Sequence, residues 1–98
     1  MMAKIVDVLV TWVASKAMIL PDAVRYITVA KFEEDVKTWE KEAWSVVLEF
    51  TEPPAKQGNP SHGKARFLVE TAPEDRLVSG KMFEMYEGKE KVAEVVIL

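Results

Sequence analysis

The chain of 98 residues contains no cysteine and only one histidine. The missing cysteines exclude a disulfide framework, a thiolate metal site and a cysteine nucleophile. One histidine without a cysteine partner cannot supply an ordinary transition-metal site. We therefore expect a protein with no catalytic residue, no metal and no cofactor. The absence of cysteine also fits a reducing compartment, and the expected location is the cytoplasm.

The chain also lacks a long apolar run and an excess of basic residues. No stretch approaches the roughly 18 consecutive apolar residues of a membrane span, and residues 1–13 lack the features of a secretion signal. The 13 basic and 16 acidic side chains are interspersed in both halves of the chain. Nucleic-acid binding depends on clustered Lys and Arg side chains. Membrane and nucleic-acid partners are therefore not expected.

What the chain does contain is a series of segments in which β-branched, aromatic and polar residues alternate. Alternation with a period of two is typical of strands with one buried face. We expect a single domain over residues 1–98, because a chain of this length forms one core. The pattern indicates a barrel or a sandwich, and the predicted fold is mainly all-β, a small antiparallel β-barrel of about six strands. The predicted strands are residues 4–13, 24–32, 44–51, 64–71, 81–87 and 91–98.

Two connecting segments have distinct patterns. Phe32, Val36, Trp39 and Ala43 lie at helical spacing, which predicts a short helix near residues 33–42, with an irregular crossover as the alternative. Residues 52–63 hold three prolines and two glycines, so no regular ladder is expected there.

Long loops often carry function, and the segment 52–64 is the longest expected connection. His62 could serve as a general base or an anion contact with help from Lys64, or it could be a solvated loop residue. The candidate ligand contacts of this loop are Lys56, His62 and Lys64.

The first and last predicted strands are apolar on both faces. If Val8 and Val95 point into a barrel, alternation places other apolar residues outside it. An exposed apolar patch usually marks an interaction surface, although residues 14–39 could instead cover it within the chain. We therefore predict a non-enzymatic protein-interaction module that pairs with itself as a homodimer, or with another protein, through its first and last strands. The candidate interface residues are Ile5, Leu9, Val13, Val92, Val96 and Leu98.

Residues 44–98, and more loosely the first predicted strand, carry a recognisable pattern. It includes Ala65-Arg66-Phe67-Leu68, the hairpin Phe83-Glu84-Met85-Tyr86-Glu87-Gly88 and the strand Val92-Ala93-Glu94-Val95. The pattern resembles the C-terminal β-barrel domain of elongation factor Tu and small stand-alone bacterial proteins that share this barrel.

This resemblance implies a bacterial protein with the barrel fold, and it makes an RNA- or ribosome-associated accessory factor an alternative role. A small-ligand binder using the 52–64 loop is the other alternative. The chain has no Gly-x-x-x-x-Gly-Lys-Ser/Thr phosphate loop. GTP binding of that kind is therefore not expected, and none of the family's functional residues is assigned.

Overall fold

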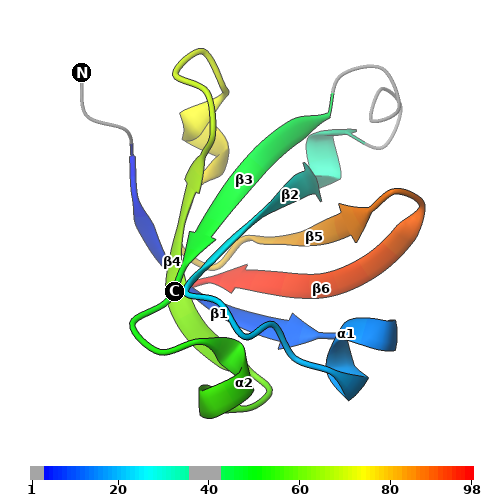
Figure 1. Ribbon diagram of the computed structural model, residues 1–98. Helices are drawn as coiled ribbons and strands as arrows, with labels where there is room; N and C mark the ends of the chain where they lie inside the picture. The colour runs from blue at the N-terminus through cyan, green and yellow to red at the C-terminus, as the bar shows by residue number, and fades with distance from the viewer. Residues whose placement is uncertain (1–3, 36–42) are drawn as a thin grey trace.

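Six strands close into an antiparallel barrel in the computed structural model, which describes residues 4–35 and 43–98 (Figure 1). The order around the barrel is β1-β4-β3-β2-β5-β6, and β1 pairs with both β4 and β6. This arrangement confirms the prediction of a mainly all-β, six-stranded barrel. The strands are β1 Val6–Trp12, β2 Arg25–Lys31, β3 Trp44–Glu49, β4 Ser61–Phe67, β5 Met82–Glu87 and β6 Glu90–Ile97.

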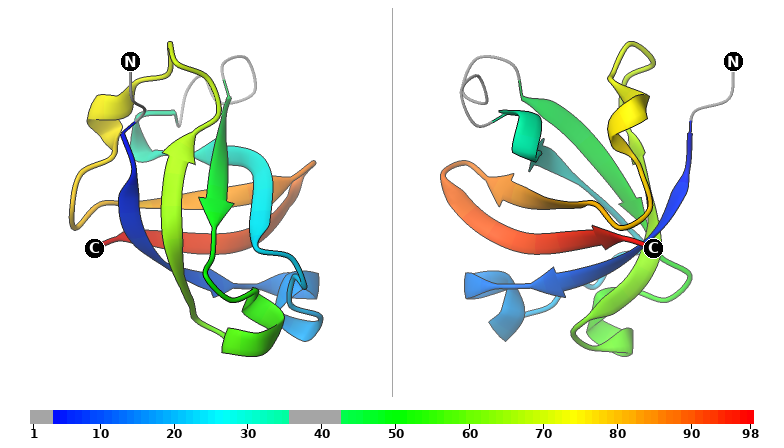
Figure 2. Two further views of the ribbon diagram at one scale, coloured as in Figure 1. Left: turned by 60° about the vertical axis from the view of Figure 1, so that its left-hand side comes forward. Right: turned by 180° about the vertical axis from the view of Figure 1, so that it is seen from behind.

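Short helical segments lie at the two ends of the barrel. The α-helices α1 (Ala14–Met18) and α2 (Pro54–Gln57) lie at one end. The 3-10 helices η1 (Glu33–Asp35) and η2 (Glu74–Arg76) lie at the other (Figures 1 and 2). Of the helix predicted near residues 33–42, only η1 falls within the described part of the chain, and residues 36–42 lie outside it.

Alternation in the strands places one apolar face inside the barrel, and aromatic side chains fill its ends. At the η1 end the ring of Phe32 lies 4.7 Å from that of Phe83 and 5.5 Å from that of Phe67. At the other end Trp12, which is 1% exposed, meets Tyr26 edge to face at 5.2 Å. Burial of these large side chains supplies much of the core's hydrophobic stabilisation.

The strand β4 begins three residues before the predicted start at residue 64. Ser61 and Gly63 are buried in the barrel wall, although their composition resembles that of a loop. The hydroxyl of Ser61 accepts a hydrogen bond from Trp12 Nε1 at 3.1 Å and donates to the Gly58 carbonyl at 2.7 Å. The prediction that residues 52–63 form an irregular loop was therefore wrong at α2 and at the start of β4.

Glycine is required at position 63 because β4 packs closely against Phe50 at this point. A Cβ atom at position 63 would lie 2.6 Å from the Phe50 ring and 2.8 Å from the Glu49 carbonyl oxygen. Both distances are shorter than van der Waals contact. The glycine therefore reflects close packing inside a strand rather than a turn.

An asparagine side chain extends the β1–β4 ladder just before β4 begins. The register pairs Val10 with Ser61, so Trp12 lies opposite Asn59. Asn59 Oδ1 accepts from the Trp12 amide at 2.8 Å, and Asn59 Nδ2 donates to the Trp12 carbonyl at 2.9 Å. These two bonds reproduce those of a backbone pair and satisfy both polar groups of Trp12.

Candidate interaction surface

Three apolar side chains of the outer face lie in one row across β1, β6 and β5. The register places Leu9 opposite Val96, and Val96 opposite Met82. Side chains directly opposite each other on antiparallel strands have Cβ atoms about 5 Å apart. Leu9, Val96 and Met82 are therefore neighbours, and we call them the apolar row.

The apolar row is open to solvent. Met82 is 50% exposed and Val96 is 39% exposed, while Leu9 is half-buried. Beside the row, Leu98 and Ile5 are also more than half exposed. The structure thus places the predicted residues Ile5, Leu9, Val96 and Leu98 on the outside. Met82 was not among the predicted residues, although its alternation with the buried Phe83 and Met85 is a signal for an outward side chain.

Val92 was predicted to be exposed, and that prediction was wrong. Val92 is 1% exposed and belongs to the buried core. The register of β6 against β5 shifts at this position, because Met85 pairs with Ala93 and Tyr86 pairs with Lys91. This β-bulge interrupts the alternation, so Val92 and Ala93 are both buried. The amide of Val13, which is itself half-buried, donates to the Val92 carbonyl at 2.9 Å, so the segment after β1 lies against the start of β6 and leaves the apolar row uncovered.

Ion pairs border the apolar row on both sides. On one side Lys64 Nζ lies 3.2 Å from the Asp7 carboxylate. On the other side Lys91 Nζ lies 2.7 Å from Glu84 and 2.5 Å from Glu94. The hydrogen bond from Lys91 lowers the pKa of Glu84 below its ordinary value of 4.5, and the two carboxylates raise the pKa of Lys91. The charges beside the row are thus largely neutralised within the protein.

Two of the three predicted loop contacts lie together. His62 and Lys64 both border a cavity of about 320 Å³, whereas Lys56 on α2 does not. Glu49, which also borders it, is held by Arg25 at 3.1 Å and Arg66 at 3.3 Å. The Arg25 hydrogen bond, assisted by Arg66, lowers the pKa of Glu49. The cavity therefore presents mostly charges that already have partners.

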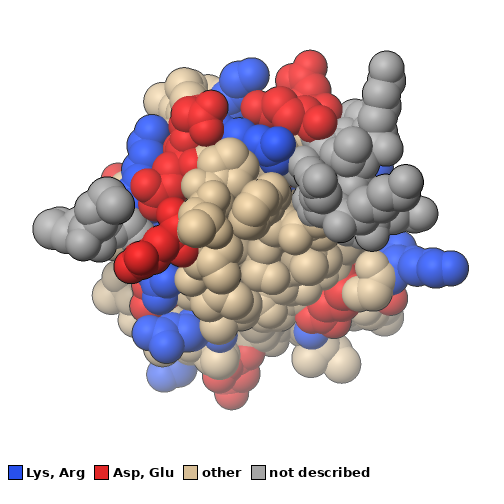
Figure 3. Space-filling model, turned by 90° about the horizontal axis from the view of Figure 1, so that it is seen from above, with Lys and Arg blue, Asp and Glu red and all other residues tan. Residues whose placement is uncertain are grey.

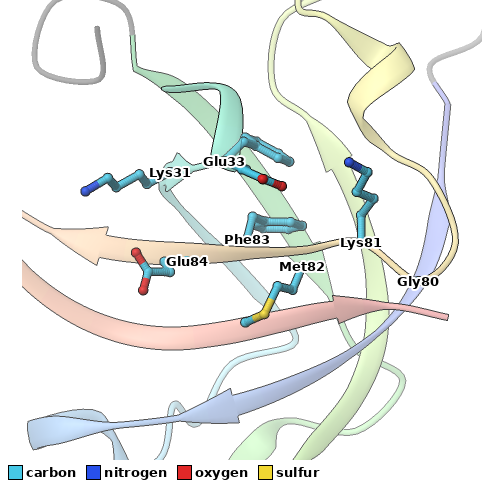
Figure 4. Close-up of a pocket in the computed structure, with 8 residues that line it drawn as sticks. Lys31, Glu33, Gly80, Lys81, Met82, Phe83 and Glu84 are labelled. Carbon is cyan, nitrogen blue, oxygen red and sulfur yellow. The ribbon is translucent and has the colours of Figure 1, made fainter. Parts of the chain in front are cut away.

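A larger cavity of about 490 Å³ lies between the end of β2 and the start of β5 (Figure 4). Phe83 and Met82 of β5 border it, together with Glu33 of η1 and Lys81. Met82 thus belongs to both the apolar row and this cavity. No local pattern predicts this cavity, because residues 31–33 and 80–84 meet only in the folded barrel.

Further apolar groups lie elsewhere on the outer surface. Ile27 on β2 and Leu68 after β4 are each nearly half exposed, and Met18 and Ile19 at the end of α1 are more than 80% exposed. The barrel end that carries η1 and η2 has an uncharged centre bordered by charged side chains (Figure 3).

Two findings concern metals and membranes. Within residues 4–35 and 43–98, no group of three or more His, Asp and Glu side chains is placed to hold a metal ion. None of the helices in this described part is long and apolar enough to cross a membrane.

Comparisons with protein-family models, with curated proteins and with solved structures give no match to this chain.

Proposed function

We propose that the chain is a non-enzymatic, cytoplasmic interaction module that forms a homodimer through the apolar row. The observation that carries this proposal is the register-paired row of Leu9, Val96 and Met82 on the outside of a closed barrel. Covering apolar surface contributes about 25 cal/mol for each Å² removed from water. Ile5 and Leu98, which are exposed beside the row, enlarge the area that a partner can cover.

The charges around the row favour a second copy of the chain as the partner. In a symmetric dimer the same patch meets itself, so unpaired charges of one sign would repel. Here Lys64 is paired with Asp7, and Lys91 is shared by two carboxylates, which leaves one net negative charge on each surface. Two such surfaces repel only through this single charge.

The alternative role on RNA or the ribosome has weaker support. The basic side chains Arg25, Arg66 and Lys64 are engaged by Glu49 and Asp7. Phosphate binding would have to compete with these pairs. The likeness to the elongation factor Tu barrel therefore remains a proposal about ancestry, with no RNA-binding site attached to it.

Size-exclusion chromatography with light scattering tests the dimer. We expect the wild-type chain to have twice the monomer mass over a range of about 10 µM to 1 mM. Leu9→Lys and Val96→Glu each place a charge in the covered surface and should weaken association at least about tenfold.

Thr11→Lys is the matched control, because Thr11 is exposed on the same face of β1 but lies outside the row. This variant should dimerise like the wild type. A monomeric wild-type chain across the whole concentration range, or equal dimerisation of all four proteins, would refute the proposal.

A further inference from the structure

The seam between β2 and β5 is open at Met82. The two strands pair only where Val29, Ala30 and Lys31 face Tyr86, Met85 and Glu84. After Lys31 the chain turns into η1, whereas β5 extends further, to Met82. On the side facing β2, β5 therefore extends from Glu84 back to Met82 without a paired strand.

The backbone polar groups of Met82 point into this open seam. Ile97 donates its amide hydrogen to the Lys81 carbonyl at 2.8 Å, so the Lys81 carbonyl and the backbone groups of Phe83, which lies opposite Val95, are directed toward β6. In an antiparallel ladder the intervening residues direct theirs to the opposite side. Met82 consequently offers one N–H donor and one C=O acceptor on the side where β2 has ended.

The cavity of about 490 Å³ lies beside this free pair. The rings of Phe32 and Phe83, whose centroids lie 4.7 Å apart, form its apolar base. Glu33 and Lys81 border it near the ring of Phe83 (Figure 4). Within the described part of the chain neither of these side chains forms an ion pair or a side-chain hydrogen bond, unlike Glu84 with its Lys91 partner.

We propose that the seam binds an extended peptide segment of a partner protein, which adds to β5 as a short antiparallel strand at Met82. Strand addition of this kind takes its affinity from main-chain hydrogen bonds and its specificity from side-chain pockets. An apolar side chain of the peptide fills the cavity over Phe83. A basic residue of the peptide pairs with Glu33, and an acidic residue pairs with Lys81.

This peptide-binding activity goes beyond self-association. It uses the backbone edge of β5, whereas the dimer uses outward side chains of β1, β6 and β5. Failure of either proposal can therefore be recognised separately. Leu9→Lys, which should dissociate the dimer, should leave peptide binding within about twofold of the wild-type value.

A selection experiment tests the seam. Random phage-displayed peptides of about ten residues are selected on the immobilised full chain. A recovered peptide is labelled with fluorescein and titrated by fluorescence anisotropy. The proline of Met82→Pro removes an N–H that makes no ladder bond, so the barrel should still form. We expect at least about tenfold weaker binding to Met82→Pro, and binding within about threefold for the control Met82→Leu.

Two further measurements keep the test decisive if Met82→Pro does not fold. Lys81→Glu should weaken binding of the same peptide at least about threefold, because an attractive pair becomes repulsive. The peptide should also slow hydrogen exchange at the Met82 amide of the wild-type chain. The proposal is overturned if selection enriches no peptide, if the recovered peptide binds Lys81→Glu as well as the wild type, or if exchange at Met82 is unchanged.

Discussion

At the scale of single residues, Gly63 allows β4 to pack directly against Phe50 because it has no side chain. We predict that Gly63→Ala lowers the free energy of unfolding by about 2 kcal/mol, because the new methyl group overlaps both a ring and a backbone oxygen. Urea denaturation followed by tryptophan fluorescence measures this loss. His62→Ala is the control, since His62 is exposed next to Gly63. Equal midpoints for the two variants would contradict the packing role.

The contact of Lys91 with Glu84 and Glu94 predicts how stability depends on pH. The pKa of Glu84 is lowered in the folded state, so the folded chain binds this proton more weakly than the unfolded chain does. The resulting stabilisation is complete above the ordinary value of 4.5 and is lost as the pH falls below it. Lys91→Met should remove this stabilisation. It also leaves the Glu84 carboxylate opposite that of Glu94 on the neighbouring strand.

We expect Lys91→Met to cost about 0.5 kcal/mol at pH 7, because both side chains of the Lys91–Glu84 pair are about one third exposed and solvent screens them. The difference from the wild type should shrink as the pH falls from 7 to about 3. Urea titrations at several pH values measure it. Lys89→Met, which removes a charge from the exposed hairpin turn, should show no such trend. A constant difference across the pH range would exclude this linkage.

At the scale of elements, a β-bulge in β6 turns Val92 into the core. The register against β5 shifts between Lys91 and Ala93, and Val92 is 1% exposed. We predict that Val92→Ala lowers the free energy of unfolding by about 2 kcal/mol through the cavity it leaves. Val96→Ala, four residues along the same strand, should change it by less than about 0.5 kcal/mol. Thermal and urea unfolding of both variants compare the two positions, and equal losses would contradict the burial of Val92.

At the scale of the whole molecule, barrel closure creates the surface proposed for dimerisation. Leu9 and Val96 lie near opposite ends of the chain and become neighbours only because β1 pairs with β6. A dimer is stabilised by mass action. The midpoint of thermal unfolding should therefore rise with protein concentration for the wild type and stay constant for Leu9→Lys.

The alternation of apolar and polar residues was enough to predict the strands and an all-β fold, because strand periodicity is a local property of the chain. It left a barrel and a sandwich open, and closure depends on the pairing of β1 with β6. The same alternation placed Leu9 and Val96 on the outside. It failed at Ser61 and Gly63, where small residues were interpreted as a loop. Their place in β4 depends on Trp12 and Phe50, which are distant in sequence.

The sequence alone therefore determined which segments become strands and which of their faces are apolar, since both follow from side-chain spacing. Only the tertiary structure decided which apolar residues remain exposed. Val92 and Val96 occupy equivalent positions in the alternation of the sequence, yet the β-bulge turns Val92 into the core while Val96 stays exposed. The open edge at Met82 was likewise decided by where β2 leaves the sheet, which is a relation between strands rather than a property of either one.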